Sequence, residues 1–184
     1  DGYFHNNVEL IGISRRFFYF LYKSILSKCS NQELIFQNKY VLENTAFIHI
    51  RDYSLIDISI DNLNDQYYIK GINYLKNKKI NKFVLISARE SYLTKNLCNY
   101  FKEANINFES RINENVYDDF LLMANAKFLI IANSSLSSAA ALLSYKLKDT
   151  KENKPTVIYP NFKIEGEFSY WDPSFMRLNG WIGF

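Results

Sequence analysis

Short apolar runs alternate with longer segments of helical spacing over most of the chain, and this alternation limits the folds open to it. The run TAFIHI at residues 45–50 is short and apolar, with branched side chains typical of a buried strand. The segment DQYYIKGINYLKNK at residues 65–78 repeats its apolar positions at helical spacing. The same patterns predict strands at 82–87, 106–110, 128–132 and 156–160, and helices at 91–104, 118–126 and after Ser135.

Strands that alternate with helices of about 10–15 residues indicate βαβ units, in which neighbouring strands are parallel. Because such crossovers are right-handed, the predicted fold class is α/β, with a Rossmann-like, doubly wound parallel sheet. The two ends of the chain have a different pattern. We therefore predict a connecting helical segment at residues 1–41, a Rossmann-like domain at 42–160 and a loop-rich aromatic tail at 161–184.

Composition excludes several classes of protein. A hydrophobic content of 48% over 184 residues is enough for a packed domain and excludes a disordered chain. The formal net charge of +3 is too small to predict nucleic-acid binding, although it is compatible with a small anionic ligand. Cys29 and Cys98 lack metal-ligand spacing, so we expect no metal site and a reducing compartment.

The most apolar long segment is ISRRFFYFLYKSIL at residues 13–26. Arg15, Arg16 and Lys23 interrupt it, which favours an amphipathic helix over a membrane-spanning one. We expect a cytoplasmic protein in which this helix contacts a partner domain, with peripheral membrane contact as the alternative.

Polar side chains follow three of the predicted strands where each strand ends. His49, Arg51 and Asp52 close the first, Ser87 closes the second, and Asn133 follows the run at 128–132. Ligands of doubly wound sheets bind beyond the carboxyl ends of the strands. We therefore expect these residues to converge on one crevice.

The stretch AKFLIIANSSLSSAAALLS at residues 126–144 predicts a buried strand that turns directly into a helix. A helix N-terminus presents unpaired N–H groups and partial positive charge, which suit phosphate. Small residues let a phosphate approach the backbone, and the hydroxyls of Ser134, Ser135 and Ser137 can donate to it. Arg51, and also Arg89, can pair with phosphate oxygens. No G-x-G-x-x-G or Walker motif is present, so standard dinucleotide and ATP sites are not predicted.

Each of these features also has a purely structural interpretation. The Asn133–Ser137 cluster is consistent with helix capping, and Arg51 and Asp52 with a local surface ion pair. His49 lies in a strand pattern, where a hydrogen-bonded core histidine is common. Asp118 and Asp119 fit favourable charge at a helix start, not an acid/base pair.

Several segments of the chain, taken in their order along the sequence, resemble segments of the α-1,2-fucosyltransferases of glycosyltransferase family 11. The most specific block of that family contains I-I-A-N-S-S-x-S, which occurs here at residues 130–137. The opening DGYFHN is similar to the family's G-Y-[WF]-Q segment. The other segments that carry the resemblance are FIHIRDYS, DQYYIKGINYL, KFVLIS, DDFLLMANAK and KPTVIYPNF.

The resemblance implies a GT-B enzyme with two Rossmann-like domains, of which the C-terminal one binds the donor GDP-fucose. It implies transfer with inversion, without a metal or other cofactor, to an acceptor glycan. Arg51 would hold the donor phosphate and His49 would support its loop. The predicted donor-binding residues are His49, Arg51, Ser87, Asn133, Ser134, Ser135 and Ser137, and the predicted catalytic residues are Arg51 and Asp52.

The chain departs from the family pattern at four points. The segment HIRDY at residues 49–53 is two residues shorter than H-x-R-R-G-D-Y, and ISAR at 86–89 replaces F-S-D-D. SAAA at 138–141 replaces W-W-G-A, and the N-terminal G-G-L-G-N-Q is absent. We therefore expect the donor-binding half of such an enzyme, with a missing N-terminal domain as its partner.

Three hypotheses about function follow. The first is a fucosyltransferase-like enzyme in which Arg51 and the helix N-terminus stabilise the leaving group. Its general base would be Asp52 or a residue of the missing half. The second is a degenerate, non-catalytic nucleotide-sugar-binding domain, and the third is a glycosyltransferase with another donor.

Overall fold

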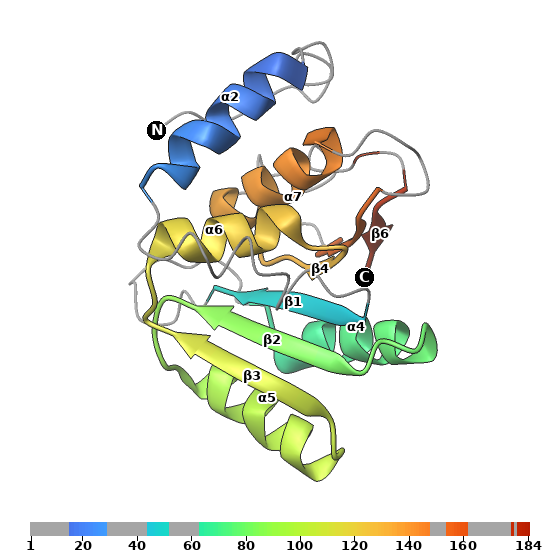
Figure 1. Cartoon of the computed structure of the whole chain (residues 1–184). Coiled ribbons are helices and arrows are strands. Elements are labelled where there is room, and N and C mark those ends of the chain that lie inside the picture. Colours follow the sequence, from blue (N-terminus) through green and yellow to red (C-terminus); the bar gives the residue numbers. More distant parts are fainter. Residues whose placement is uncertain (1–14, 29–43, 52–62, 148–153, 162–177, 179) are drawn as a thin grey trace, which may run out of the picture.

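A six-stranded sheet in the order β3-β2-β1-β4-β5-β6 forms the centre of the fold, and every neighbouring pair of strands is parallel (Figure 1). The computed structural model describes residues 15–28, 44–51, 63–147, 154–161, 178 and 180–184. Its strands are β1 (Thr45–Ile50), β2 (Lys82–Ser87), β3 (Asn107–Ile112), β4 (Phe128–Ile130), β5 (Thr156–Tyr159) and β6 (Ile182–Gly183). Its helices are α2 (Arg15–Leu26), α4 (Asp65–Asn77), α5 (Tyr92–Glu103), α6 (Val116–Asn125) and α7 (Ser135–Leu147).

Helices cover both faces of the sheet. α4 and α5 pack on one face, α6 and α7 pack on the other, and α2 lies across α6 and α7 (Figure 1). Side chains alternate along the strands accordingly: Phe47 joins the core under α6 and α7, whereas Ala46 and Ile48 join the core under α4 and α5. The predicted doubly wound, Rossmann-like α/β class is therefore confirmed.

Side-chain caps fix where the helices begin. Ser91 caps α5, which begins at Tyr92, in a capping box with Thr94. α6 begins at Val116, two residues before the predicted start, because the Asn115 side chain accepts hydrogen bonds from the next free N–H groups. The helix boundary was thus set by an asparagine that the apolar spacing did not mark.

Two strands end two residues away from their predicted ends. β3 extends to Ile112 instead of ending at Ser110, because it pairs with β2 over its whole length. β4 ends at Ile130 instead of Ala132, because the turn towards α7 has already begun: the Ser134 amide donates to the Ala132 carbonyl oxygen at 2.9 Å.

Both flanking parts of the chain contribute to this fold. Leu26 of α2 belongs to the core under α6 and α7, and the Asn125 amide donates to the Tyr22 hydroxyl at 3.3 Å. Strand β6, from the predicted tail, pairs with β5.

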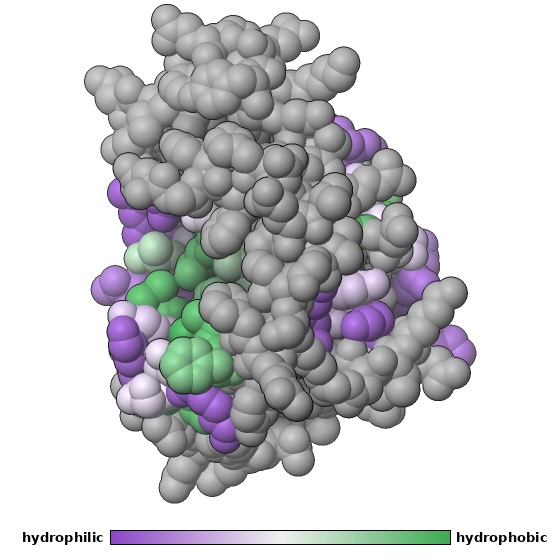
Figure 2. Space-filling view, turned by 90° about the horizontal axis from the view of Figure 1, so that it is seen from above, coloured by the Kyte–Doolittle hydropathy of each residue, from purple (hydrophilic) through white to green (hydrophobic). Residues whose placement is uncertain are grey.

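Viewed from the α2 side, the described surface includes hydrophobic residues bordered by hydrophilic ones (Figure 2), and Phe20 is 72% exposed. None of the helices described is long and apolar enough to cross a membrane.

Close packing of α4 on β4 depends on Gly71. A Cβ atom at this position would lie 2.9 Å from Cδ1 of Ile130 and 3.4 Å from two further atoms of that side chain. Ile130 is fully buried, so its side chain has little room to move.

We expect Gly71→Ala to lower the free energy of unfolding by about 1–2 kcal/mol, because overpacking outweighs the gain in helix propensity. In an Ile130→Val background, which removes Cδ1, the same substitution should become neutral or stabilise by up to about 1 kcal/mol. Urea denaturation of the four proteins measures this coupling. Equal effects of Gly71→Ala in both backgrounds would show that the contact with Ile130 is not limiting.

Candidate functional site

The carboxyl ends of β1, β2 and β4 lie at one edge of the sheet. Ile50 is paired with Ser87, and Ile48 is paired with Ile130, so the residues that follow these strands emerge side by side. The structure thus brings Arg51, Ser87 and the turn after β4 to the same edge. Asp52 lies outside the described residues.

The strand order reverses beside β1. From β1 the chain proceeds outward to β2 and β3, then returns to add β4 on the opposite side of β1. In doubly wound sheets the ligand crevice lies at such a reversal. Arg51 follows β1 and Asn133 follows β4, so these two residues flank the reversal, whereas Ser87 lies one strand away.

The turn from β4 into α7 is held by serine hydroxyls. Ser138 Oγ donates to the Ser134 carbonyl at 2.8 Å, and Ser137 Oγ lies 3.3 Å from that oxygen and 3.4 Å from the Ala132 carbonyl. Ser137 is completely buried, which favours a structural role. The predicted contact of Ser137 with a sugar-nucleotide donor stays a prediction. Ser135 is exposed at the first position of this 13-residue helix, where N–H groups have no intrahelical partner.

His49 is buried at the same edge, with its side chain on the α6/α7 side of the sheet. The residue is 5% exposed, and Nδ1 has no hydrogen-bond partner among the described residues. Burial, together with the positive charge of Arg51, lowers the pKa of His49 to about 4. At neutral pH the ring is therefore uncharged, and Arg51 carries the positive charge alone in this pair.

Ser87 uses its polar groups to shape the neighbouring turns. Its hydroxyl donates to the Arg89 carbonyl at 2.8 Å, and its own carbonyl accepts from the Asn113 amide at 3.0 Å. The residue is 3% exposed. These bonds hold the ends of β2 and β3 in place at the candidate site.

Tyr67 is a residue of this edge that the sequence analysis did not identify. Its buried hydroxyl lies 2.7 Å from the Ile131 carbonyl oxygen and 3.3 Å from that of Ile158. Burial, and to a lesser degree Tyr68, raises the pKa of this hydroxyl, which stays a donor. The first turn of α4 is thereby bound to the ends of β4 and β5. The sequence could have identified Tyr67 because it occupies an apolar, inward-facing position of the predicted helix, and a buried tyrosine hydroxyl needs a hydrogen-bond partner.

An ion pair stands at the end of β3. Arg111 Nε lies 3.1 Å from Asp119 Oδ1, with side chains 11% and 7% exposed. Burial raises the pKa of Asp119, and the bond to Arg111 opposes this shift. Asp119 lies in the first turn of α6, where its charge was predicted to be favourable. The contact with Arg111 was not predicted.

No protein-family model, curated protein or solved structure matches the chain. Within the described part, no group of three His, Cys, Asp or Glu side chains is arranged to hold a metal ion. Among the described residues of this edge, the Arg51 guanidinium and the start of α7 are suited to bind an anion.

We expect Tyr67→Phe to lower the free energy of unfolding by about 1–2 kcal/mol, because it removes a buried donor from two carbonyl oxygens. The matched control is Tyr100→Phe, whose exposed hydroxyl donates to Asn73 at 2.9 Å. That change should cost less than about 0.5 kcal/mol. Equal losses in thermal or urea unfolding would contradict a special role for Tyr67.

The buried, neutral His49 makes stability depend on pH. The unfolded chain binds a proton below the ordinary pKa of 6.5, whereas the folded chain does so only below about 4. The folded state therefore keeps its full stability with respect to His49 above pH 6.5. As the pH falls towards 4, the free energy of unfolding decreases by a total on the order of 3 kcal/mol.

His49→Leu should remove this dependence, because leucine does not titrate. Urea unfolding at pH 7 and pH 4.5 should show the variant gaining stability relative to the wild type at the lower pH. A constant difference between the two proteins across this range would refute the assignment.

Proposed function

We propose that this chain binds a nucleoside diphosphate sugar at the carboxyl edge of its sheet, as the donor-binding part of a glycosyltransferase. The observation that carries the proposal is that Arg51 and the N-terminus of α7 follow adjacent strands, β1 and β4, on either side of the reversal in strand order. By its motifs, the enzyme is most like an inverting α-1,2-fucosyltransferase that moves fucose from GDP-fucose to a galactoside hydroxyl in surface glycan synthesis.

The chemistry of a diphosphate fits these groups. A guanidinium binds phosphate oxygens through two parallel N–H bonds, and a helix N-terminus adds backbone N–H donors and partial positive charge. The exposed Ser135 leaves the start of α7 open to such an anion. The uncharged His49 adds no positive charge at neutral pH, so Arg51 supplies the side-chain charge of this pair.

In the proposed reaction, the acceptor hydroxyl attacks the anomeric carbon while the bond from that carbon to the diphosphate oxygen breaks. Negative charge then develops on the diphosphate, where Arg51 and α7 stabilise it. A general base takes the proton of the hydroxyl. We assign this role to Asp52 or to a residue of an N-terminal partner domain, and not to Asp119, which is buried and paired with Arg111.

One observation favours a second candidate, a domain that binds the nucleotide without turnover. The hydroxyls of Ser87, Ser137 and Ser138 all bond to backbone carbonyls. Most of the phosphate binding then depends on Arg51 and α7, and binding without transfer is the simpler function for such a site.

Calorimetric titration with GDP, followed by GDP-fucose, tests the proposal. We expect micromolar binding of GDP that Arg51→Ala weakens by at least about tenfold, because a charge-assisted pair is lost. Lys127→Ala removes a cation from an exposed position before β4, at the opposite edge, and should leave binding unchanged.

If a folded sample shows no binding of GDP, UDP or other nucleotides, the proposed site is wrong. If the wild type and Arg51→Ala bind GDP equally well, the nucleotide site does not lie at this edge of the sheet. Transfer of fucose to a galactoside, by the chain alone or together with an added N-terminal domain of the same enzyme family, would separate the enzyme from the non-catalytic alternative.

A further inference from the structure

One edge of the sheet is formed by a full-length strand. β3 lies at the end of the strand order and, within the described part of the chain, pairs only with β2 (Figure 1). None of its six residues is buried, whereas all six residues of β1 are buried. An unpaired strand edge presents N–H and C=O groups that can pair with another strand.

Backbone groups of alternate residues point out of this edge. The Asn113 amide donates to the Ser87 carbonyl of β2 at 3.0 Å. Because N–H and C=O groups alternate in direction along a strand, the odd-numbered residues of β3 turn these groups towards β2. Phe108, Ser110 and Ile112 therefore turn theirs away from the sheet, where a further strand can pair with them.

Two opposite charges stand beside the edge, on the face that α6 and α7 cover. Glu109 is paired with Val84, which belongs to the core on that face, and Arg111 lies two residues further along the strand. Arg111 Nε is held by Asp119 at 3.1 Å, and Glu109 lies 3.9 Å from Lys82. A guanidinium has four further N–H donors, so Arg111 can bind a second carboxylate.

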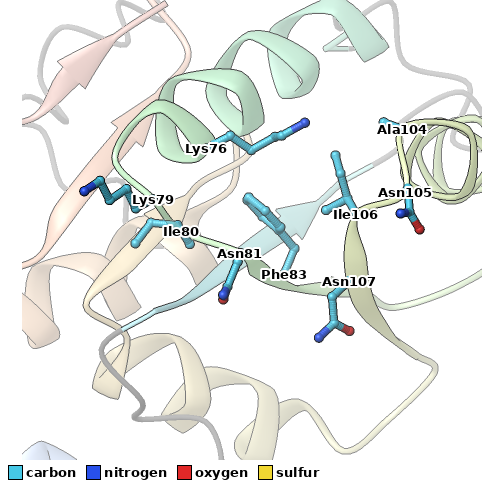
Figure 3. A pocket seen from close by; sticks show the side chains of 9 residues that line it. All are labelled: Lys76, Lys79, Ile80, Asn81, Phe83, Ala104, Asn105, Ile106 and Asn107. Carbon is cyan, nitrogen blue, oxygen red and sulfur yellow. The ribbon is translucent and has the colours of Figure 1, made fainter.

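The other face of β3 is packed on α5. The ring of Phe108 stacks on Phe101 with 4.9 Å between their centroids. At the amino end of the strand, a hollow of about 430 Å³ lies between the ends of α4 and α5 (Figure 3). The amides of Asn81 and Asn107 point away from Lys76 and from this hollow (Figure 3), which therefore presents no converging groups for a ligand.

These side chains favour one register for pairing β3 with a copy of itself. In an antiparallel pair, residues that lie opposite must both turn their backbone groups towards the partner strand or both turn them away. A two-fold axis through Ser110 meets this condition and places Phe108 opposite Ile112 of the second copy. It also places Glu109 opposite Arg111 of the second copy, whereas an axis through either charged residue would place like charges opposite each other.

We propose that two copies of this chain associate through antiparallel pairing of their β3 strands, which joins the two sheets into one. The interface is isologous, so each copy supplies one Glu109 and one Arg111 to two equal ion pairs. The axis reverses the strand direction, so the two carboxyl edges lie on opposite sides of the joined sheet. β2 separates β3 from β1 and β4, and the proposal does not depend on nucleotide binding there.

The test is sedimentation equilibrium of the whole chain between about 5 and 500 µM. Because strand addition buries a small area, we expect a dimer with a dissociation constant of roughly 10–100 µM. Glu109→Lys places a cation opposite Arg111 of the second copy at two positions and should weaken association by at least about tenfold. The control Gln66→Lys adds a cation at an exposed position of α4 and should leave association unchanged.

Ser110→Pro removes an N–H group that points away from β2, so it should also weaken association by at least about tenfold while the sheet stays intact. Circular dichroism and urea unfolding check the fold of both variants. If Ser110→Pro does not fold, Glu109→Lys and hydrogen exchange of the wild type decide the question.

Hydrogen exchange followed by NMR identifies the strand. The amides of Phe108, Ser110 and Ile112 should become protected as the protein concentration rises, whereas those of Glu109 and Arg111 should be protected throughout. A monomer at every concentration, exchange at the three amides that does not depend on concentration, or wild-type association of the folded variants would each overturn the proposal. Because Arg51 is untouched, failure here leaves the GDP titration unaffected.

Discussion

Burial of β1 on both faces is the constraint on which the rest of the structure depends. All six of its residues are buried, β2 pairs with it in parallel over all six residues, and β4 pairs with it in parallel over residues 46–48. A strand in this position cannot face water on either side, so helices must cover both faces and every crossover must return to the same edge. The layer of helices on each face, and the common edge where the strands end, both follow from this central strand.

Much of the fold was predictable because periodicity reports burial. The run at residues 45–50 is apolar at four of its six positions, on both faces of the strand, which distinguishes a strand covered on both faces from a half-exposed one. Boundaries set by single polar contacts were not predictable in this way. Asn115 moved the start of α6 by two residues, and the two-residue strand β6 depends on pairing with β5 and not on its own sequence.

The candidate site was predictable in outline only. Parallel topology decides which residues stand at the carboxyl edge, so Arg51 and Asn133 were placed there from the order of the strands. The sequence could not decide which hydroxyl groups remain available, because that depends on carbonyl oxygens brought near by folding. Ser137 and Ser87 turn inward to such oxygens, and Tyr67 reaches carbonyls of two strands far from it in the chain.

The hydroxyl of Tyr67 has a consequence for how this domain can diverge. It fixes the start of α4 against the ends of β4 and β5, while the ladder with β2 fixes the end of β1. The connection from Arg51 to Leu63 therefore runs between two anchored points beside the reversal in strand order. Since the entropy of closing a loop grows slowly with its length, insertions and deletions in this connection carry little thermodynamic penalty. The length of this connection can thus change between related chains while the scaffold on either side of it stays the same.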